Sequence, residues 1–381
     1  MYPRIEVEGG SGERGRQYGE AARERVQRSV EAYGEVFAHY AGWDWERVRT
    51  EAAAYRGPVE AYEPRYMEEM DGLAEGAGVD PLDVLAINVR TEIMFAATAR
   101  ELGRLPAECT SFAAVPSRTA QGELLVGQNW DWLPHAADTT VILEARQDDG
   151  PDFVTVVEAG LLAKVGMNSA GMAIATNALV TAADEGRPGV PYHVLLRALH
   201  DAETPADTMT ALGRRERSSS ANYLVAHADG IALDVEAAPG DYGQLFVGYP
   251  DNGVILHTNH FANPGFSGGD VGLVSMSDSV FRLMRARQLV AEHAGPLDRE
   301  FFESLLADHA AHPHGVCCHP DPRLQPADQS ATLASVIMEP ATRRLWVAAG
   351  TPCAAPFELL DYGSWLDKPP AVRRDVRAFA A

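Results

Sequence analysis

Residues 107–114 read AECTSFAA and mark the point where the character of the chain changes. The residues before this stretch repeat apolar side chains at helical spacing, whereas those after it form runs typical of strands. A lone cysteine at such a boundary is usually a small buried apolar residue. Here Cys109 is followed by two hydroxyl residues, Thr110 and Ser111, which raises the alternative that its thiol is reactive.

The sequence before Cys109 predicts helices. Apolar side chains recur at intervals of three and four residues between Tyr18 and Phe37, as they do on one face of a helix. The same spacing recurs over residues 66–73. Asp80 precedes Pro81 and is expected to cap a further helix, because a carboxylate accepts hydrogen bonds from the free amides and proline fits the first turn.

The sequence after Cys109 predicts strands. The strand-like runs are LLVGQNWDW, TTVILEARQ, FVTVVEAG, NYLVAHADGIALDVEAA, QLFVGYPDNGVILHTNHF and TLASVIMEPATRRLWVAAG. Turn pairs such as Asp229-Gly230 and Asn252-Gly253 separate them, and turns this short join antiparallel strands. Helical patterns interrupt the strands at about residues 192–212, 279–293 and 298–310. We therefore expect an α+β protein with two sheets faced by helices.

Composition and charge narrow the classes of partner and the cellular compartment that we expect. The chain has 381 residues and a formal net charge of −22, which disfavours nucleic-acid or anionic-membrane partners because their phosphates would repel it. No secretory leader and no membrane-spanning run are expected. The four cysteines are too few for a disulfide framework and suit a reducing cytoplasm. The sequence leaves the formation of a homo-oligomer open.

Cleavage of the Glu108–Cys109 peptide bond would make Cys109 an N-terminal residue. Its α-amine would then have an unperturbed pKa of about 7.7–8.0, against about 8.5 for the thiol, and could act as the base for that thiol. The thiol can make the cut itself by attacking the Glu108 carbonyl, after which water hydrolyses the ester-like intermediate. A Cys–His pairing is the alternative, since the chain contains 12 histidines.

The segment ECTSFAA, followed by GQNWDW at residues 127–132, resembles the isopenicillin-N acyltransferase family, also classified as peptidase family C45. This family belongs to the N-terminal nucleophile hydrolases and is more distantly similar to the choloylglycine hydrolases. Further segments that resemble it are GERGRQYGE, GMNSAGMAIATNAL, LHTNHF, CCHPDP and TLASVIMEP, so the resemblance covers nearly the whole chain. The combination of ECTSFAA with GQNWDW is specific to this family, whereas each of the other segments is weak evidence when taken alone.

The resemblance implies a fold and a processing event. The implied fold is the four-layer αββα sandwich of N-terminal nucleophile hydrolases, in which helices flank two stacked, mainly antiparallel sheets. The implied event is self-cleavage before Cys109, giving a helical α-chain (residues 1–108) and a catalytic β-chain (residues 109–381) that stay associated. Family members usually have glycine before the cysteine, whereas this chain has Glu108, whose carboxylate can hinder the attack or carry a proton.

The resemblance also implies roles for further residues. Asp131 matches an aspartate that holds the α-amine, and Asn259 matches an asparagine whose NH₂ faces the oxyanion. Asn177 matches a second oxyanion donor, which acts mainly through its backbone N–H. Arg282 aligns loosely with an active-site arginine, although helical arginines are usually surface charges. Gln128 replaces an arginine of the choloylglycine hydrolases, which favours the acyltransferase branch.

The segment HPHGVCCH at residues 312–319 has the composition of a metal site. Its spacing fits no common zinc pattern, and the sequence shows no second ligand cluster. We therefore favour a loop near the substrate, and we expect neither a metal nor a cofactor.

These observations predict a self-processing N-terminal-cysteine amidohydrolase or acyltransferase. Cys109 would form an acyl-thioester with a small-molecule amide or acyl-CoA-like substrate, and water or an amine would accept the acyl group. One alternative is an unprocessed enzyme in which a histidine such as His257 is the base. Another is a non-catalytic binding protein on the same sandwich. The sequence does not identify the acyl donor or acceptor, because specificity depends on small differences between pocket contacts.

Overall fold

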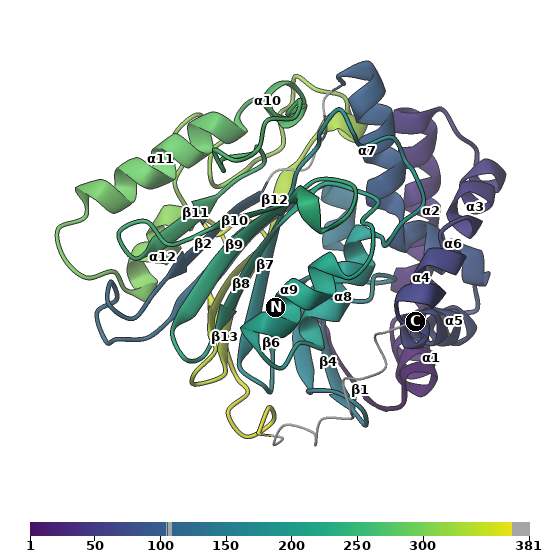
Figure 1. Ribbon diagram of the computed structural model, residues 1–381, viewed down its shortest axis with the longest axis horizontal. Helices are drawn as coiled ribbons and strands as arrows, with labels where there is room; N and C mark the ends of the chain where they lie inside the picture. The colour runs from purple at the N-terminus through teal and green to yellow at the C-terminus, as the bar shows by residue number, and fades with distance from the viewer. Residues whose placement is uncertain (104, 106–108, 368–381) are drawn as a thin grey trace.

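The computed structural model describes residues 1–103, 105 and 109–367, and two stacked sheets lie at its centre (Figure 1). Within these ranges the first sheet has eight strands, in the order β1 (Arg4–Gly9), β4 (Thr140–Gln147), β5 (Phe153–Glu158), β6 (Val165–Asn168), β7 (Met172–Ala178), β8 (Ala221–His227), β9 (Ile231–Ala237) and β10 (Leu245–Gly248). In the same part of the chain the second sheet has six, in the order β11 (Val254–His257), β2 (Cys109–Ala114), β3 (Leu125–Trp132), β12 (Ala331–Glu339), β13 (Arg344–Ala349) and β14 (Glu358–Asp361).

Helices cover the outer faces of both sheets. The helices before Cys109 gather at one side (right in Figure 1) and are α1 (Ser11–Ala21), α2 (Arg23–Ala41), α3 (Trp45–Ala53), α4 (Arg56–Tyr62), α5 (Pro64–Ala77), α6 (Pro81–Asn88) and α7 (Arg90–Glu101). The helices on the first sheet are α8 (Tyr192–His200) and α9 (Pro205–Gly213). Those beside the second sheet are α10 (Gly272–Ser275), α11 (Ser279–Glu292) and α12 (Arg299–Leu306). Short 3₁₀ turns occur at Pro134–Ala137, Tyr242–Gln244 and Pro326–Asp328.

The expected αββα sandwich is confirmed by this arrangement. Strands β2 and β3 of the second sheet pack against β7 of the first, so the two sheets share an interior. Every strand pair in the described ranges is antiparallel except β1 with β4. Among the same residues, no helix is both long and apolar enough to cross a membrane.

Strand β1 corrects the expectation that the first hundred residues are purely helical. Its sequence, RIEVEG, places Ile5 and Val7 in the core while the charged residues between them stay exposed. This alternation is the pattern of a half-buried strand. The strand pairs in parallel with β4, where Arg4 lies opposite Ile142. The N-terminal region therefore contributes a strand to the first sheet as well as a layer of helices.

The helices expected before Cys109 are present, with one break. The face over residues 18–37 is divided at Ala22, where α1 ends and α2 begins. The cap at Asp80 is confirmed, because its side chain accepts from the Leu82 N–H at 2.9 Å and Asp83 completes a capping box. Likewise, the helical region expected over residues 192–212 consists of α8 and α9, with Pro205 beginning the second helix.

The turn at Asn252-Gly253 corrects the expected strand pairing. A turn this short predicts that the strands on either side of it form one antiparallel pair, but β10 pairs with β9 in the first sheet and β11 pairs with β2 in the second. Pro250 has no N–H to extend the ladder beyond β10. The turn therefore carries the chain from one sheet to the other, and β11 becomes the neighbour of the strand that begins with Cys109.

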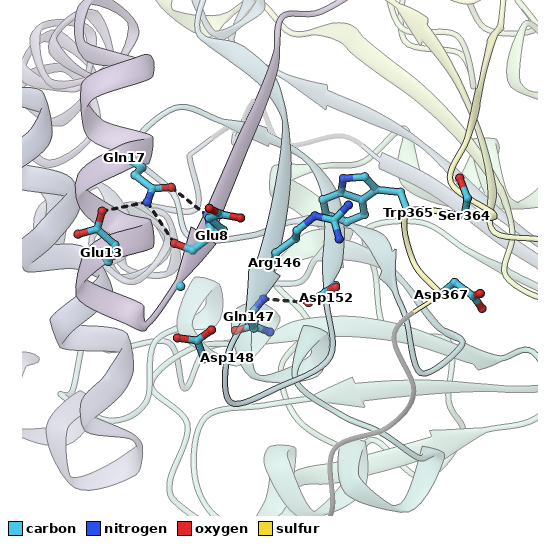
Figure 2. A pocket seen from close by; sticks show the side chains of 11 residues that line it. Glu8, Glu13, Gln17, Arg146, Gln147, Asp148, Asp152, Ser364, Trp365 and Asp367 are labelled. Carbon is cyan, nitrogen blue, oxygen red and sulfur yellow. Dashed lines mark hydrogen bonds between the residues drawn. The ribbon is translucent and has the colours of Figure 1, made fainter.

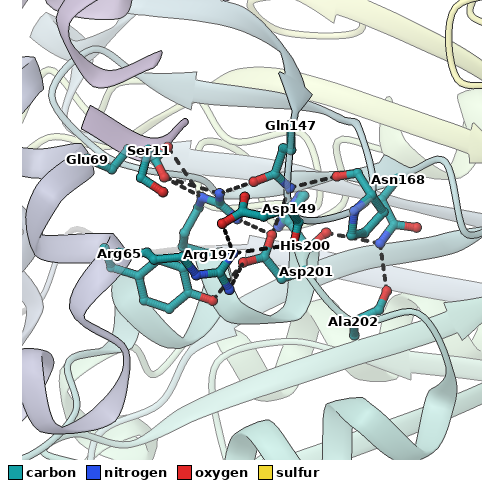
Figure 3. A network of polar contacts seen from close by, with 12 residues as sticks. Ser11, Arg65, Glu69, Gln147, Asp149, Asn168, Arg197, His200, Asp201 and Ala202 are labelled. Carbon is teal, nitrogen blue, oxygen red and sulfur yellow. Dashed lines mark hydrogen bonds and ion pairs between the residues drawn. The ribbon is translucent and has the colours of Figure 1, made fainter. Parts of the chain in front are cut away.

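A buried polar network joins the helices before Cys109 to the first sheet (Figure 3). Arg197 on α8 pairs with Glu69 on α5 at 3.1 Å and with Asp201 at 2.6 Å. It also donates to Gln147 Oε1 on β4 at 2.7 Å. Tyr66 on α5 donates to the Asp201 carboxylate at 2.9 Å. Residues on both sides of the Glu108–Cys109 bond thus share one ionic cluster.

Candidate active site

Cys109 is the first residue of β2 and lies between β11 and β3 in the second sheet. Its side chain is 4% exposed and lines a small cavity of about 20 Å³. The other walls of this cavity include Arg90, Trp130, Asp131, Lys164, Tyr192 and His193. A space of this size is close to the minimum that holds one water molecule. The thiol therefore lines a cavity whose wall includes charged and polar side chains beside apolar ones.

Three of the residues expected from the sequence hold the backbone of Cys109. Its N–H donates to Asn259 Oδ1 at 2.6 Å. Its carbonyl oxygen accepts from Arg282 Nη1 at 2.7 Å and from Asn177 Nδ2 at 3.2 Å. These three partners come from the segment after β11, from α11 and from β7, respectively. The fold thus brings residues from three distant parts of the chain to both sides of one residue.

Asn259 is oriented differently from the resemblance-based expectation. Its Oδ1 accepts from both Cys109 N–H and Arg282 Nη2, the latter at 3.0 Å, while its Nδ2 donates to the Ala178 carbonyl at 3.0 Å. The reason is that two donors face Asn259 in the unbroken chain, so the amide turns its acceptor toward them. The Ser279 hydroxyl holds this segment by accepting from the Asn259 N–H at 2.6 Å.

Arg282 is buried on α11 and only 1% exposed, unlike most helical arginines. Its Nε donates to Asp278 Oδ2 at 2.9 Å, one helical turn earlier, and this ion pair fixes the guanidinium. The other nitrogens reach Cys109, Asn259 and, at 3.2 Å, Thr110 Oγ1. The planar guanidinium suits this multiple recognition, which a lysine ammonium would not reproduce.

Asn177 reaches Cys109 across the interior between the sheets, and its side chain makes the contact. The resemblance implied a different group, the backbone N–H, as the oxyanion donor. Its Oδ1 accepts from the Ser111 hydroxyl at 2.6 Å and from Asn222 Nδ2 at 3.2 Å. Asn222 also donates to Asp234 Oδ1 at 2.8 Å. The position of Asn177 is therefore fixed by partners on strands of both sheets.

Asp131 is fully buried on β3, and its Oδ1 accepts from the Thr332 hydroxyl on β12 at 2.6 Å. Gln128, three residues earlier on the same strand, accepts from the Thr176 N–H at 2.7 Å and so bridges the two sheets. Asp131 also lines the Cys109 cavity. Glu108, the residue before the expected cleavage site, lies outside the described residues.

The environment of the thiol keeps it neutral. Burial raises the pKa of Cys109 to about 11, and the nearby Asp131 charge acts in the same direction. Lys164, a hydrogen bond from the Asp131 backbone and Arg282 lower this pKa without compensating for burial. Since the thiolate is the nucleophilic form, Cys109 in the unbroken chain needs a base.

Lys164, between β5 and β6, is one of several residues of this cavity that were not predicted from the sequence. Its Nζ lies 4.9 Å from the ring centroid of Trp130 and 5.8 Å from that of Tyr192. Burial lowers the pKa of Lys164 to about 8, although the charge of Cys109 acts in the opposite direction. A signal was present, because only two of the 32 basic residues are lysines and this one interrupts the apolar run LLAKVGM.

The alternative mechanism has a histidine such as His257 as the base for Cys109, but His257 does not line the Cys109 cavity. His257 donates from Nε2 to Glu236 at 2.9 Å and from Nδ1 to the Thr258 carbonyl at 2.7 Å. Burial lowers the pKa of His257, but Asp234 and Glu236 raise it to about 9, so its ring is a poor base near neutral pH. His193 is the histidine on the wall of the Cys109 cavity.

Larger hollows lie elsewhere on the molecule. One of about 940 Å³ is lined by Glu8, Glu13, Gln17 and Arg146 together with residues near Trp365 (Figure 2). Another of about 770 Å³ includes Asp234, Glu236 and His257 in its wall. Neither contains a residue of the Cys109 cavity, so size alone does not identify the reactive centre.

Comparisons with known proteins identify the family of the chain. The family model described as acyl-coenzyme A:6-aminopenicillanic acid acyl-transferase matches residues 117–354, more than half of the chain. The matched range includes Asp131, Asn177, Asn259 and Arg282. A relative from Emericella nidulans, the 40 kDa form of acyl-coenzyme A:6-aminopenicillanic-acid-acyltransferase, is 28% identical over 292 residues, covering 76% of each chain.

Two solved structures are also similar. A mutant of conjugated bile acid hydrolase from Clostridium perfringens has a TM-score of 0.46 and 13% identity, covering 70% of this chain and 97% of its own. Penicillin V acylase from Agrobacterium tumefaciens has a TM-score of 0.37 and 13% identity, with coverage of 66% and 86%.

Proposed function

Because the chain belongs to the acyl-coenzyme A:6-aminopenicillanic acid acyl-transferase family, we propose that it is a self-processing enzyme whose N-terminal Cys109 transfers or hydrolyses acyl groups. The observation that carries this proposal is the convergence of Asn259, Arg282 and Asn177 on the backbone of Cys109. The buried N–H and carbonyl of any residue need partners, but here one partner is the buried guanidinium of Arg282, and burying a charge is unfavourable unless it is paired.

In the proposed cleavage, Cys109 Sγ attacks the carbonyl carbon of Glu108. The bond from that carbon to the Cys109 nitrogen breaks, and the nitrogen gains a proton. The acyl group of Glu108 is then held on sulfur as a thioester. One water hydrolyses this thioester, which gives a carboxylate on Glu108 and regenerates the thiol. The products are the chains 1–108 and 109–381.

Lys164 is the base that we propose for this first cut. Before cleavage Cys109 has no α-amine, so the proton of its thiol must move to another group. Lys164 lines the same cavity, and its pKa of about 8 leaves a fraction of neutral amine near neutral pH. The ammonium formed there can return the proton to the departing nitrogen of Cys109.

Cleavage produces the base for later turnovers. The α-amine of Cys109 remains next to Asn259 Oδ1 and takes the thiol proton during attack on the substrate. The resemblance assigns the NH₂ of Asn259 to the oxyanion, and in the unbroken chain this group is bound to Ala178. The acyl-thioester on Cys109 then passes its acyl group to water or to an amine. We propose a small molecule carrying an amide or acyl thioester as the donor.

The two chains are expected to stay together after cleavage. Strand β1 belongs to the first chain and forms hydrogen bonds with β4 of the second. Arg90 of the first chain is paired with the buried Glu158 of the second. The cluster around Arg197 and Glu69 spans the same boundary (Figure 3). None of these contacts involves Glu108 or Cys109.

Trapping the acyl-enzyme tests the acyl-transfer chemistry. The protein is mixed with a panel of acyl-coenzyme A thioesters and simple amides, quenched in acid and digested. We expect an acyl mass on the peptide that begins at Cys109, and its release by hydroxylamine as a thioester. Cys353→Ala is the control, because this exposed thiol could be acylated nonspecifically. Failure of every donor to label Cys109 while Cys353 reacts would favour the non-catalytic alternative.

One observation favours a second mechanism without processing. His193 lines the Cys109 cavity, and burial together with the charges of Arg90 and Lys164 keeps its pKa well below the usual value. Its neutral ring could therefore accept the thiol proton. In that case His193→Gln would abolish acyl transfer in a full-length chain. Under the self-processing proposal, Lys164→Met slows cleavage and His193→Gln still yields two chains.

A further inference from the structure

Four side chains outside the Cys109 cavity direct ligand-type atoms at one another. His319 Nε2 lies 3.1 Å from His309 Nε2, 3.4 Å from Cys317 Sγ and 3.5 Å from Cys353 Sγ. All four atoms lie within 4.8 Å of one another. They come from three segments: the turn after α12, the loop before β12 and the turn after β13.

Hydrogen bonding alone does not explain this convergence. An imidazole nitrogen either donates one proton or accepts through one lone pair. His319 Nε2 can therefore form a hydrogen bond with only one of its three close neighbours. A cation placed between the four atoms would contact all of them at once.

The three distances from His319 Nε2 are close to those of tetrahedral zinc coordination, and the remaining separations are all within 4.8 Å. Zinc lies about 2.3 Å from thiolate sulfur and about 2.0–2.1 Å from imidazole nitrogen, so a tetrahedron places two nitrogens about 3.3 Å apart and nitrogen and sulfur about 3.6 Å apart. The observed separations of 3.1, 3.4 and 3.5 Å differ from these values by a few tenths of an ångström. Two cysteines with two histidines form one of the common structural zinc ligand sets.

We propose that His309, Cys317, His319 and Cys353 bind one Zn²⁺ ion. On binding, each thiol loses its proton to solvent, and the two thiolates neutralise the charge of the ion. The protein supplies all four ligands, so no position stays open for a substrate, and the site is structural. No second ligand cluster was visible in the sequence near residues 312–319, because the fourth ligand, Cys353, follows β13 and reaches the loop only in the folded protein.

The backbone around the proposed site is already fixed by hydrogen bonds. The Cys317 N–H donates to the Asp308 carbonyl at 3.0 Å, and the His319 N–H donates to the Pro313 carbonyl at 2.8 Å. The turn that carries Cys353 is closed by a bond from the Ala354 N–H to the Thr351 carbonyl at 3.0 Å. Little ordering is therefore needed when the metal binds.

Hydrogen bonds connect the proposed site to Asp131, a residue of the Cys109 cavity. The N–H of Cys318, between two ligands, donates to the Thr332 hydroxyl at 3.0 Å. That hydroxyl donates to Asp131 Oδ1 at 2.6 Å. Asn129 adds a bond to the Val316 carbonyl at 2.8 Å. The ion would thus secure the loop that orients Asp131, but its binding can be measured without reference to any activity of Cys109.

The test uses the full-length protein and Zn²⁺ alone. The chain is incubated with excess Zn²⁺, dialysed and analysed for metal by mass spectrometry, and Co²⁺ is substituted in a parallel sample. We expect about one zinc per chain and, with Co²⁺, the intense visible bands and thiolate charge-transfer bands of a tetrahedral site. Cys353→Ser and His309→Ala, both at exposed positions, should lose the metal while keeping the circular dichroism of the native fold.

Two neighbouring residues provide the controls. His312 stacks near His319, with ring centroids 5.1 Å apart, and Cys318 is buried beside Cys317, but neither belongs to the ligand set. His312→Ala and Cys318→Ala should therefore retain zinc. The proposal is overturned if the wild-type chain binds no zinc, if peptide mapping finds a Cys317–Cys353 disulfide in place of metal, or if His312→Ala loses zinc while His309→Ala retains it.

Discussion

Asn259 accepts hydrogen bonds from two donors through one oxygen atom, and these two bonds define the geometry at the Cys109 N–H. The oxygen accepts from the Cys109 N–H and from Arg282, while Ser279 fixes the Asn259 backbone. Motif resemblance named Asn259, Asn177 and Arg282 as site residues, and all three contact Cys109, while their catalytic roles stay predictions. It did not predict the direction of the amide, because that depends on which donors face it in the folded chain.

Arg282 can be tested against an arginine on the same helix. Arg282→Met removes donors to the Cys109 carbonyl and to Asn259, and we expect cleavage to slow by about 10²–10³-fold, the loss typical of one oriented donor. Arg282→Lys should recover part of the rate, since it restores the charge without the planar fork. Arg287→Met, on the exposed side of α11, should cleave normally. Equal rates for the 282 and 287 variants, measured by pulse-labelled electrophoresis, would remove Arg282 from the mechanism.

Lys164 gives the cleavage rate its expected pH dependence. The pKa of Lys164 is about 8, and at a pH below this value its ammonium form cannot accept the thiol proton. The rate of cleavage should therefore rise with pH and level off above the pKa. Lys164→Met should cleave about 10²–10⁴-fold more slowly and lose this dependence. Lys368→Met, the variant of the other lysine, is the control. The rates are measured on chain made by cell-free synthesis; a wild-type profile that is flat from about pH 6 to about pH 9 would exclude this base.

At the scale of elements, helix identity was easier to predict than strand partners. Asp80 and its capping box signal a helix start within a few residues. Strand β10 pairs with β9, the strand just before it, whereas the position of β11 depends on its pairing with β2, far away in the sequence. Lys164 was missed for the same reason, because it reaches Cys109 only when the two sheets stack. Strand β1 was predictable from its alternation, but helical patterns dominate the residues around it.

Helices α1 and α5 cross at glycines that leave no room for a side chain. A Cβ on Gly19 would lie 2.2 Å from the Leu73 carbonyl oxygen, which is too close without a backbone shift. We expect Gly19→Ala to reduce the free energy of unfolding by about 1–3 kcal/mol, as overpacking does. Gly57→Ala on α4 is the matched control, since no atom lies within 4 Å of the added carbon. Urea unfolding measures both variants, and an equal effect would show that the helices can move apart.

For the whole molecule, the layered architecture was predicted well and its internal ionic contacts were not. Alternating strand patterns and short turns identified two sheets, and the resemblance supplied their order in four layers. The cluster of Glu69, Arg197 and Asp201 was not predictable, because Glu69 on α5 meets Arg197 on α8 only in the folded protein (Figure 3). This cluster joins the two proposed chains, so it bears on whether they remain together.

Acid should weaken this junction. Burial raises the pKa of Asp201, but Arg197 and Arg65 outweigh it and hold the pKa at about 2, against 3.8 in the unfolded chain. The resulting stabilisation of about 2 kcal/mol is complete above pH 3.8 and is lost as the pH falls to about 2. Asp201→Asn should remove this part of the dependence. Urea unfolding at about pH 5, 4, 3 and 2 tests this prediction. If the unfolding free energy of both proteins had the same slope against pH, the prediction would be contradicted.

The central claim is that the Cys109 thiol cuts the peptide bond before it. The most direct measurement is the mass of the purified, denatured protein, with N-terminal sequencing of each species. We predict two chains in the wild type, one ending at Glu108 and one whose sequence begins Cys-Thr-Ser, and a single unbroken chain in Cys109→Ala. A wild-type preparation that is active in acyl transfer yet consists of one intact chain would contradict the claim.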